Sequence, residues 1–130
     1  MRLQLALNVK NLDQAVDYYS RMFGVSPHKQ RPGYANFAID DPALKLVLFE
    51  NENASDRINH LGVETATQEE LDGAIARLSA EGMVDLVEDN TTCCHATQNK
   101  VWSAEPEGIK WEWYRITDDA PPAQENSACC

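Results

Sequence analysis

The sequence predicts an α+β fold built from two βαβββ modules, because the same patterns recur in the same order in both halves of the chain. Each half opens with a strand pattern, continues with an amphipathic helix that begins at a capping residue, and ends with further strand patterns. A shift of 56 residues places Gln4 on His60 and the helix start Asn11 on Thr67. A repeat in a short chain can arise by chance, but the repeated element order favours duplication.

The first module begins with a strand of strict alternation, in which the leucines up to Val9 share one face and Gln4 lies on the other. Asn11 then acts as the N-cap of a helix with an apolar stripe, and Gly24 ends that helix. The pattern therefore predicts a strand, a helix and further strands in one module. The later elements are two strands and the turn between them, expected at residues 34–39, 44–49 and 40–42.

The second module repeats this order from residue 59, and Thr67 with Glu70 three residues later forms a capping-box pattern at its helix. Further along, Lys45 aligns with Lys110, now at a shift of 65 residues, so the second module has gained nine residues. The excess must lie between the second helix and Trp102, in the stretch that contains Asn90 to His95. We expect an inserted loop there, and such loops often carry function.

Composition limits the classes of function. A chain of 130 residues with 43% hydrophobic residues fits one domain, expected at residues 1–117 with modules at about 1–52 and 57–117. Residues 118–130 are expected to be a flexible tail. The net charge of −10 argues against nucleic acid and anionic membranes as partners. No apolar run predicts export or a membrane span, so we expect a cytoplasmic protein with reduced thiols.

All four cysteines occur as adjacent pairs, Cys93 with Cys94 and Cys129 with Cys130. A disulfide between adjacent residues strains the intervening peptide, whereas a soft, thiophilic centre with two exchangeable hydroxyls suits a dithiol. The first pair therefore points to capture of a soft element. A zinc or cadmium clamp completed by His95 and a redox-active vicinal disulfide remain alternatives. The second pair is compatible with delivery of a soft metal or with an inert tail.

Three residues are candidate metal ligands. Alternation in the last strand places Glu112 on the face opposite Trp111 and Trp113, and Gln4 and His60 also lie opposite the helix-packed faces. If the two modules close a cupped mixed sheet around a common cleft, these three side chains converge and leave open coordination positions, as in catalytic sites. Each taken alone also fits a structural role, for example a hydrogen-bonded histidine or a carboxylate paired with a basic neighbour.

Several segments carry a family resemblance, above all Thr91 to Ala96. The chain resembles the ArsI organoarsenical carbon–arsenic lyases and the CadI cadmium-induced proteins, within the vicinal-oxygen-chelate superfamily of glyoxalases, bleomycin-resistance proteins and extradiol dioxygenases. The resemblance covers residues 2 to 116 and implies the vicinal-oxygen-chelate fold. The other matching segments are Asn36 to Ile39, Lys45 to Leu48 and His60 to Glu64.

The resemblance implies an enzyme that uses Fe(II) and dioxygen to cleave trivalent organoarsenicals, among them methylarsonous acid and aromatic arsenicals, to inorganic arsenite. It implies metal ligation by Gln4, His60 and Glu112, and substrate binding and catalysis at Cys93 and Cys94. His95 departs from relatives that often carry tyrosine there.

Other functions stay open beside this one. The alternatives are a cadmium- or arsenite-binding resistance protein without lyase activity, and a glyoxalase or antibiotic-modifying enzyme. Neither of the latter two needs the adjacent pair Cys93 and Cys94. A homodimer is compatible with an open sheet, although no segment of the sequence requires one.

Overall fold

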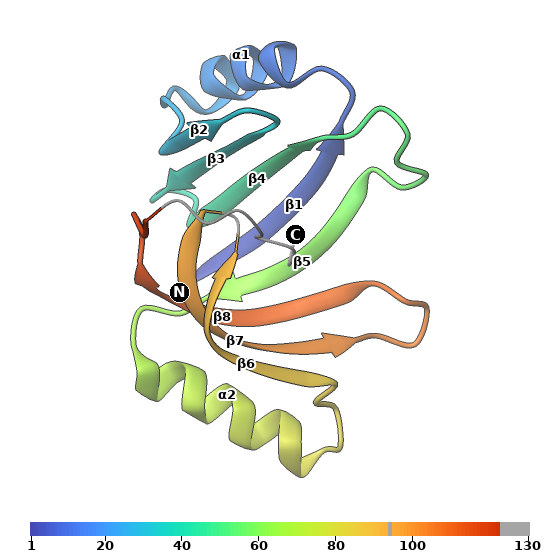
Figure 1. Cartoon of the computed structure of the whole chain (residues 1–130), viewed down its shortest axis with the longest axis vertical. Coiled ribbons are helices and arrows are strands. Elements are labelled where there is room, and N and C mark those ends of the chain that lie inside the picture. The colour runs from blue at the N-terminus through green and yellow to red at the C-terminus, as the bar shows by residue number, and fades with distance from the viewer. Residues whose placement is uncertain (94, 123–130) are drawn as a thin grey trace. The chain divides into compact units, whose positions relative to one another are not determined.

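The computed structural model describes residues 1–93 and 95–122, and within them the βαβββ order occurs twice (Figure 1). This order confirms the predicted α+β fold class. The first set of elements is β1 (Arg2–Val9), α1 (Leu12–Phe23), β2 (Lys29–Arg31), β3 (Tyr34–Ile39) and β4 (Leu44–Glu50). The second set is β5 (Ile58–Glu64), α2 (Gln68–Ala80), β6 (Leu86–Cys93), β7 (Ala96–Ala104) and β8 (Lys110–Asp118).

The described residues form two compact units, Arg2–Leu61 and those from Gly62 onward, so the boundary falls within β5. In the first unit the strand order is β2-β3-β4-β1-β5, with β1 and β4 parallel and β3 antiparallel to β4. In the second unit the order is β5-β8-β7-β6, with antiparallel pairing of β6, β7 and β8. Each unit therefore contains strands that are hydrogen-bonded to their neighbours, and β5 contributes residues to both units.

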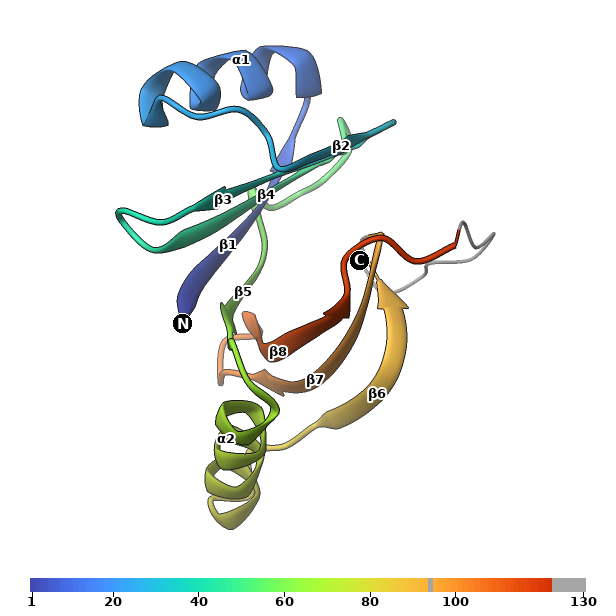
Figure 2. The same cartoon turned by 90° about the vertical axis from the view of Figure 1, so that its left-hand side faces the viewer.

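In the first unit, α1 covers one face of the strands and packs against β3 and β4 (Figure 2). The Asn11 side chain accepts a hydrogen bond from the backbone N–H of Gln14, and Gly24 ends the helix in the left-handed conformation. Both predicted helix boundaries are confirmed. The core between α1 and the strands consists of buried apolar side chains from both, namely Val9, Leu12, Ala35, Phe37, Ile39, Leu46 and Leu48.

In the second unit, α2 packs against β8, and its capping box is present: the Thr67 side chain accepts from the Glu70 backbone and the Glu70 side chain accepts in return. The Arg77 guanidinium lies 5.0 Å from the centre of the Trp113 ring. Since side chains alternate along a strand, Trp113 facing α2 directs Glu112 to the opposite face. The predicted orientation of Glu112 is therefore correct.

The excess of the second module is a longer hairpin rather than an irregular loop. β6 has eight residues where the corresponding β2 has three, and it extends as a strand to Cys93. After Cys94, which lies outside the described residues, His95 has a positive φ of 64° and β7 begins at Ala96. The expectation of a loop was wrong because the β-branched residues Thr91 and Thr92 pair with Gln98 and Thr97 of β7.

None of the helices in the described part of the chain has both the length and the apolar character needed to cross a membrane.

Candidate functional site

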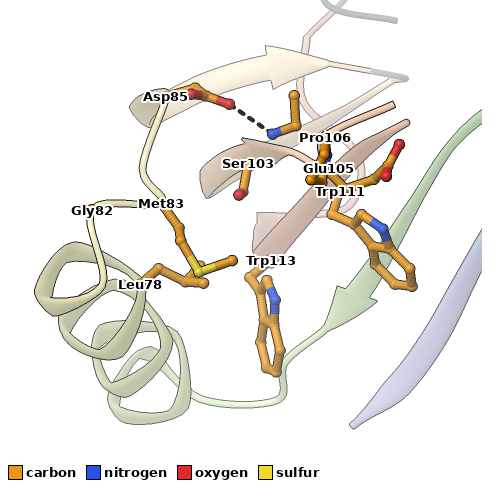
Figure 3. Close-up of a pocket in the computed structure, with 10 residues that line it drawn as sticks. Leu78, Gly82, Met83, Asp85, Ser103, Glu105, Pro106, Trp111 and Trp113 are labelled. Carbon is orange, nitrogen blue, oxygen red and sulfur yellow. Dashed lines mark hydrogen bonds between the residues drawn. The ribbon is translucent and has the colours of Figure 1, made fainter. Parts of the chain in front are cut away.

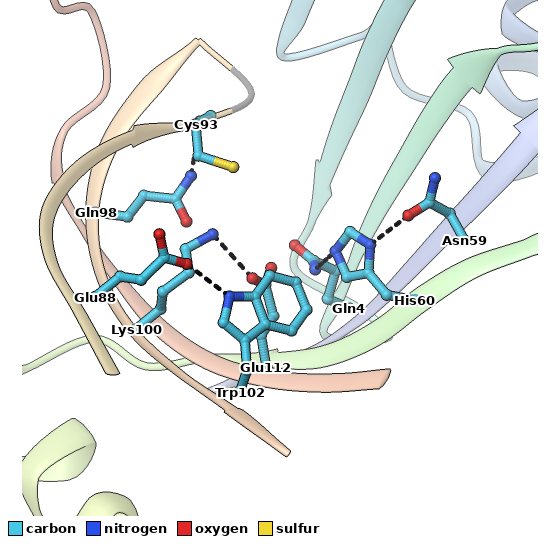
Figure 4. A network of polar contacts seen from close by, with 9 residues as sticks. All are labelled: Gln4, Asn59, His60, Glu88, Cys93, Gln98, Lys100, Trp102 and Glu112. Carbon is cyan, nitrogen blue, oxygen red and sulfur yellow. Dashed lines mark hydrogen bonds and ion pairs between the residues drawn. The ribbon is translucent and has the colours of Figure 1, made fainter. Parts of the chain in front are cut away.

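The side chains of Gln4 and His60 lie together in the first unit. Gln4 Nε2 is 3.0 Å from His60 Nε2, and both residues are buried (Figure 4). Gln4 lies on the face of β1 opposite the leucines that pack beneath α1, as the alternation predicted. The equivalence of these two positions in the repeat thus brings an amide and an imidazole into direct contact.

Asn59 fixes the orientation of the His60 ring. The two side chains meet at 2.8 Å between His60 Nδ1 and Asn59 Oδ1. Because the amide oxygen can only accept, Nδ1 carries the proton and Nε2 has its lone pair available. Asn59 is held in turn by the Asn8 side-chain oxygen at 3.1 Å, and Asn8 donates to the Asp56 carbonyl. A hydrogen bond of this kind to the outer nitrogen is typical of metal-binding histidines.

The spacing of the Gln4 and His60 side chains is compatible with two neighbouring ligands of one divalent metal. Two adjacent ligands at metal distances of about 2.1 Å and right angles lie about 3 Å apart, which matches the observed contact. Gln4 presents its amide nitrogen to His60, and a half-turn of the amide would present its oxygen instead. The described residues contain no group of three His, Cys, Asp or Glu side chains that could hold a metal. The three predicted ligands are not such a group, because one of them is a glutamine.

Glu112 lies in the second unit and is paired with Lys100. The Lys100 ammonium is 2.9 Å from Glu112 Oε2, and both side chains are almost fully buried, at 1% and 4% exposure (Figure 4). Lys100 on β7 lies directly opposite Tyr114 of β8, and Glu112 lies two residues before Tyr114 on the same strand. Lys100 and Glu112 are therefore diagonal neighbours across the two strands. A buried carboxylate is stable only with such a partner. The sequence left open a basic neighbour as the partner of Glu112, and the structure shows that the partner is Lys100 on the adjacent strand.

Cys93 lies at the end of β6 and is 1% exposed. Its carbonyl accepts a hydrogen bond of 2.9 Å from the Gln98 amide, which anchors the tip of the hairpin to the same face that carries Lys100. Cys93 is disulfide-bonded. The expectation of reduced thiols is wrong for this residue, since it rested on the redox compartment and not on geometry. Three predicted cysteines lie outside the described residues: Cys94, Cys129 and Cys130.

A cavity of about 460 Å³ lies on the other face of the second unit, between α2 and the β7–β8 hairpin (Figure 3). Trp111 and Trp113 form its apolar wall together with Leu78 and Met83. Asp85 borders it and accepts a hydrogen bond from the backbone N–H of Ala104 at 2.6 Å. None of the predicted ligands lines this cavity, because Glu112 points to the opposite face of β8.

Comparison with known proteins gives the family. The model of the glyoxalase, bleomycin resistance protein and dioxygenase superfamily matches residues 3–113. The chain belongs to this superfamily. Among solved structures, a superfamily member from Vibrio splendidus has a TM-score of 0.55 at 14% identity, covering 88% of this chain and 97% of that one. The Mn(II)-bound glyoxalase from Novosphingobium aromaticivorans has a TM-score of 0.64 at 17% identity, covering 95% of this chain and 41% of that one.

Two curated relatives in the superfamily are much closer in sequence. The cadmium-induced protein CadI of Mycobacterium tuberculosis is 51% identical over 119 residues, which cover 92% of this chain and 78% of that protein. The trivalent organoarsenical cleaving enzyme of Thermomonospora curvata is 46% identical over 133 residues, which cover 99% of this chain and 87% of that protein. The resemblance inferred from the sequence was to these two groups of proteins, and the comparisons confirm it.

Sequence reasoning missed Asn59 and Lys100. Asn59 could have been noticed as the polar neighbour of a candidate ligand histidine. Lys100 occupies an inward position in the alternation of Gln98, Lys100 and Trp102, two residues apart along one strand. A lysine at a buried strand position requires a negatively charged partner. That requirement was the available signal for its pairing with Glu112.

Proposed function

We propose that this protein is an Fe(II)- and dioxygen-dependent carbon–arsenic lyase of the cytoplasm, which cleaves trivalent organoarsenicals such as methylarsonous acid and aromatic arsenicals to inorganic arsenite. The observation that carries the proposal is the buried pair of Gln4 and His60, with Asn59 holding the imidazole ready to bind a metal. The similarity to the Thermomonospora curvata enzyme over 99% of the chain supports the substrate class.

In this proposal Gln4, His60 and Glu112 form the metal site. Fe(II) bound there would supply dioxygen binding and activation at the coordination positions that three protein ligands leave open. Glu112 contributes the single formal negative charge of the set. On β4, the residue that aligns with Glu112 at a shift of 65 is Val47, which is apolar and buried, and this supports three ligands rather than four.

Cys93 and Cys94 would capture the substrate. Each thiol loses its proton to one hydroxyl of the trivalent arsenical, two waters leave, and two sulfur–arsenic bonds form, so that only the organic group stays free on arsenic. Holding the arsenic by two bonds orients the remaining carbon–arsenic bond, which makes the following step effectively intramolecular. The disulfide at Cys93 must first be reduced, because a disulfide offers no thiolate.

The 51% identity to CadI favours one competitor, a protein that binds cadmium or arsenite through its thiols without cleaving a substrate. If this chain had that function, its Gln4 and His60 pair would be structural. The two functions differ in what happens to the carbon–arsenic bond, because sequestration leaves the bound organoarsenical intact.

The deciding experiment is a single-turnover assay. The reduced protein is loaded with Fe(II) under anaerobic conditions, given methylarsonous acid, and then exposed to dioxygen, with arsenic species measured by chromatography and mass spectrometry. The lyase proposal expects inorganic arsenite in amounts that follow the protein. Bound methylarsenical without arsenite would instead establish sequestration.

Matched variants divide the roles. Cys93→Ser should lose arsenical binding at the hairpin while it still binds the metal, and His60→Ala should lose the metal while it still binds the arsenical there. Glu112→Ala should behave as His60→Ala does. If each single variant lost both properties, the division into a metal site and a thiol site would be wrong.

A further inference from the structure

The proposed function makes no use of the cavity in the second unit. This cavity has a volume of about 460 Å³ and lies on the face of β8 that carries Trp111 and Trp113 (Figure 3). Glu112 points to the opposite face of the strand, so the cavity does not include this proposed metal ligand. Its volume lies in the range of cavities that bind small molecules. The residues that line it therefore indicate which kind of small molecule would fit.

One wall of the cavity is apolar and aromatic. Trp111 and Trp113 are two residues apart on β8, so both indole rings lie on the same face of the strand. Both are only partly buried, and Leu78 and Met83 complete the wall. The faces of indole rings are electron-rich, and among aromatic side chains tryptophan binds cations most strongly. The wall therefore favours a ligand with an apolar surface, and its rings also attract positive charge.

The charged side chains at the cavity are both acidic. Asp85 and Glu105 line it, and none of the described lysine, arginine or histidine residues does. Asp85 accepts a hydrogen bond from the backbone N–H of Ala104, and Glu105 accepts from the backbone N–H groups of Glu107 and Ile109. All these donors are neutral, and within the described part of the chain neither carboxylate forms an ion pair. Two negative charges thus border the cavity without a basic side chain to balance them.

A cation already lies on one of the two rings. The Arg77 guanidinium of α2 is 5.0 Å from the centre of the Trp113 ring, a distance at which an aromatic face attracts a cation, and Arg77 does not line the cavity. Among the residues that the structure describes, no arginine or lysine lies over the Trp111 ring. Trp111 is therefore the ring at which a cation entering the cavity would meet no competing side chain.

We propose that this cavity binds a small organic cation with an apolar body, such as a quaternary ammonium ion. The carboxylates repel anions, and a hard metal ion would need several oxygen ligands where the wall presents apolar carbon. A quaternary ammonium ion matches both parts of the cavity, because its methyl groups contact the rings and its charge is attracted by the rings and the carboxylates. This site goes beyond the proposed function and does not depend on it.

The experiment compares choline with its neutral analogue, the dimethylbutanol in which a carbon atom replaces the charged nitrogen. Each is titrated into the whole protein at constant ionic strength, and the indole N–H signals of the three tryptophans are followed by nitrogen–proton correlation NMR. We expect the signals of Trp111 and Trp113 to shift and that of Trp102 to stay, because Trp102 contacts Lys100 on the opposite face of the sheet. Choline should bind about tenfold more tightly than the alcohol, the scale of a cation on an aromatic face.

A matched pair of variants tests the contribution of the carboxylates. Asp85→Asn keeps the size of the side chain and an oxygen that accepts from Ala104, but it removes the charge. It should weaken choline binding about threefold, the scale of one exposed charge pair, and leave binding of the alcohol unchanged. Asp89→Asn removes the same charge from an exposed position of β6 outside the cavity and should bind both ligands as the wild type does. Trp111→Leu should weaken choline binding more than binding of the alcohol, because leucine retains an apolar surface but no aromatic face.

Equal affinities of the wild type for choline and the alcohol would overturn the inference, and so would shifts confined to the Trp102 signal. Equal weakening of choline binding by Asp85→Asn and Asp89→Asn would also overturn it, because the effect would then come from the net charge of −10 and not from the cavity. If Trp111→Leu fails to fold, as judged by circular dichroism, the comparison of Asp85→Asn with Asp89→Asn decides, since both substitutions change exposed side chains.

Discussion

Asn59 Oδ1 lies 2.8 Å from His60 Nδ1, which determines the tautomer of the imidazole. With the proton on Nδ1, the lone pair on Nε2 faces Gln4, the other candidate ligand of the first unit. Outer hydrogen bonds of this kind restrict the ring's rotation and raise its basicity as a ligand. The affinity of the site for metal should therefore depend on Asn59, although Asn59 does not bind the metal.

The first prediction follows from this contact. Asn59→Leu should weaken Mn(II) binding by about 10- to 100-fold, the usual cost of losing such a partner. Asn59→Asp keeps an acceptor oxygen at the same position and should retain most of the affinity. Calorimetric titration of both variants measures the difference. Equal binding by Asn59→Leu and the wild type would mean that the contact with His60 plays no part in metal binding.

The second prediction concerns Cys93. Because this residue is disulfide-bonded, untreated protein should bind no trivalent methylarsenical at the hairpin, and a non-thiol reductant should restore binding of one arsenic there. Mass spectrometry of the native protein gives the stoichiometry directly. Cys93→Ser should bind one arsenic fewer per chain than the reduced wild type, whereas Ser103→Ala in β7 should bind as the wild type does. Binding without reductant would contradict the requirement for free thiols.

The fold could be predicted from the sequence because its determinants are local. Caps at Asn11 and Thr67, the stop at Gly24 and the alternation around Gln4 each depend on a few neighbouring residues, and all are present in the structure. The repeat then supplied the order of elements. Local patterns of this kind determine the type of an element more reliably than its exact ends.

The contacts of the candidate site could be predicted only in part. The repeat paired Gln4 with His60, but a pairing between strands such as that of Lys100 with Glu112 depends on the register of β7 and β8, which the sequence does not reveal. The segment that carries Cys93 was expected to be a loop because it lies in the nine-residue excess of the second module, and an excess of residues does not reveal whether they pair as strands. The disulfide at Cys93 could not be predicted either, because it depends on which sulfur atoms the fold brings together.

The third prediction concerns two glycines in helical segments. Gly73 lies exposed in the middle of α2, where an added Cβ meets nothing within 4 Å, so Gly73→Ala should stabilise the protein by about 1 kcal/mol. Gly24 ends α1 with φ at +66°, so Gly24→Ala should destabilise it by about 1 kcal/mol. Urea unfolding of both variants measures the two changes. Effects of the same sign would contradict the assigned conformations.

The fourth prediction concerns the dependence of α2 on pH. The Glu70 side chain accepts a hydrogen bond from the Ala66 backbone N–H at 2.9 Å, and this contact, together with a weaker one from Thr67, holds the pKa of Glu70 below its ordinary value. A carboxyl group whose pKa is lowered in the folded state stabilises that state above its unfolded pKa. The stabilisation is lost as the pH falls through the folded pKa.

Glu70→Gln tests this dependence, because glutamine can occupy the same position of a capping box but does not titrate in this range. The melting temperature of the wild type should therefore fall more than that of Glu70→Gln when the pH is lowered from about 6 to about 3. Glu69→Gln, at the neighbouring exposed position, controls for the loss of one negative charge and should follow the wild type. The wild type and Glu70→Gln share every other carboxyl group, so the difference between their melting temperatures isolates the hydrogen bonds of Glu70. Melting temperatures that fall in parallel for these two proteins would show that the bonds do not stabilise the helix.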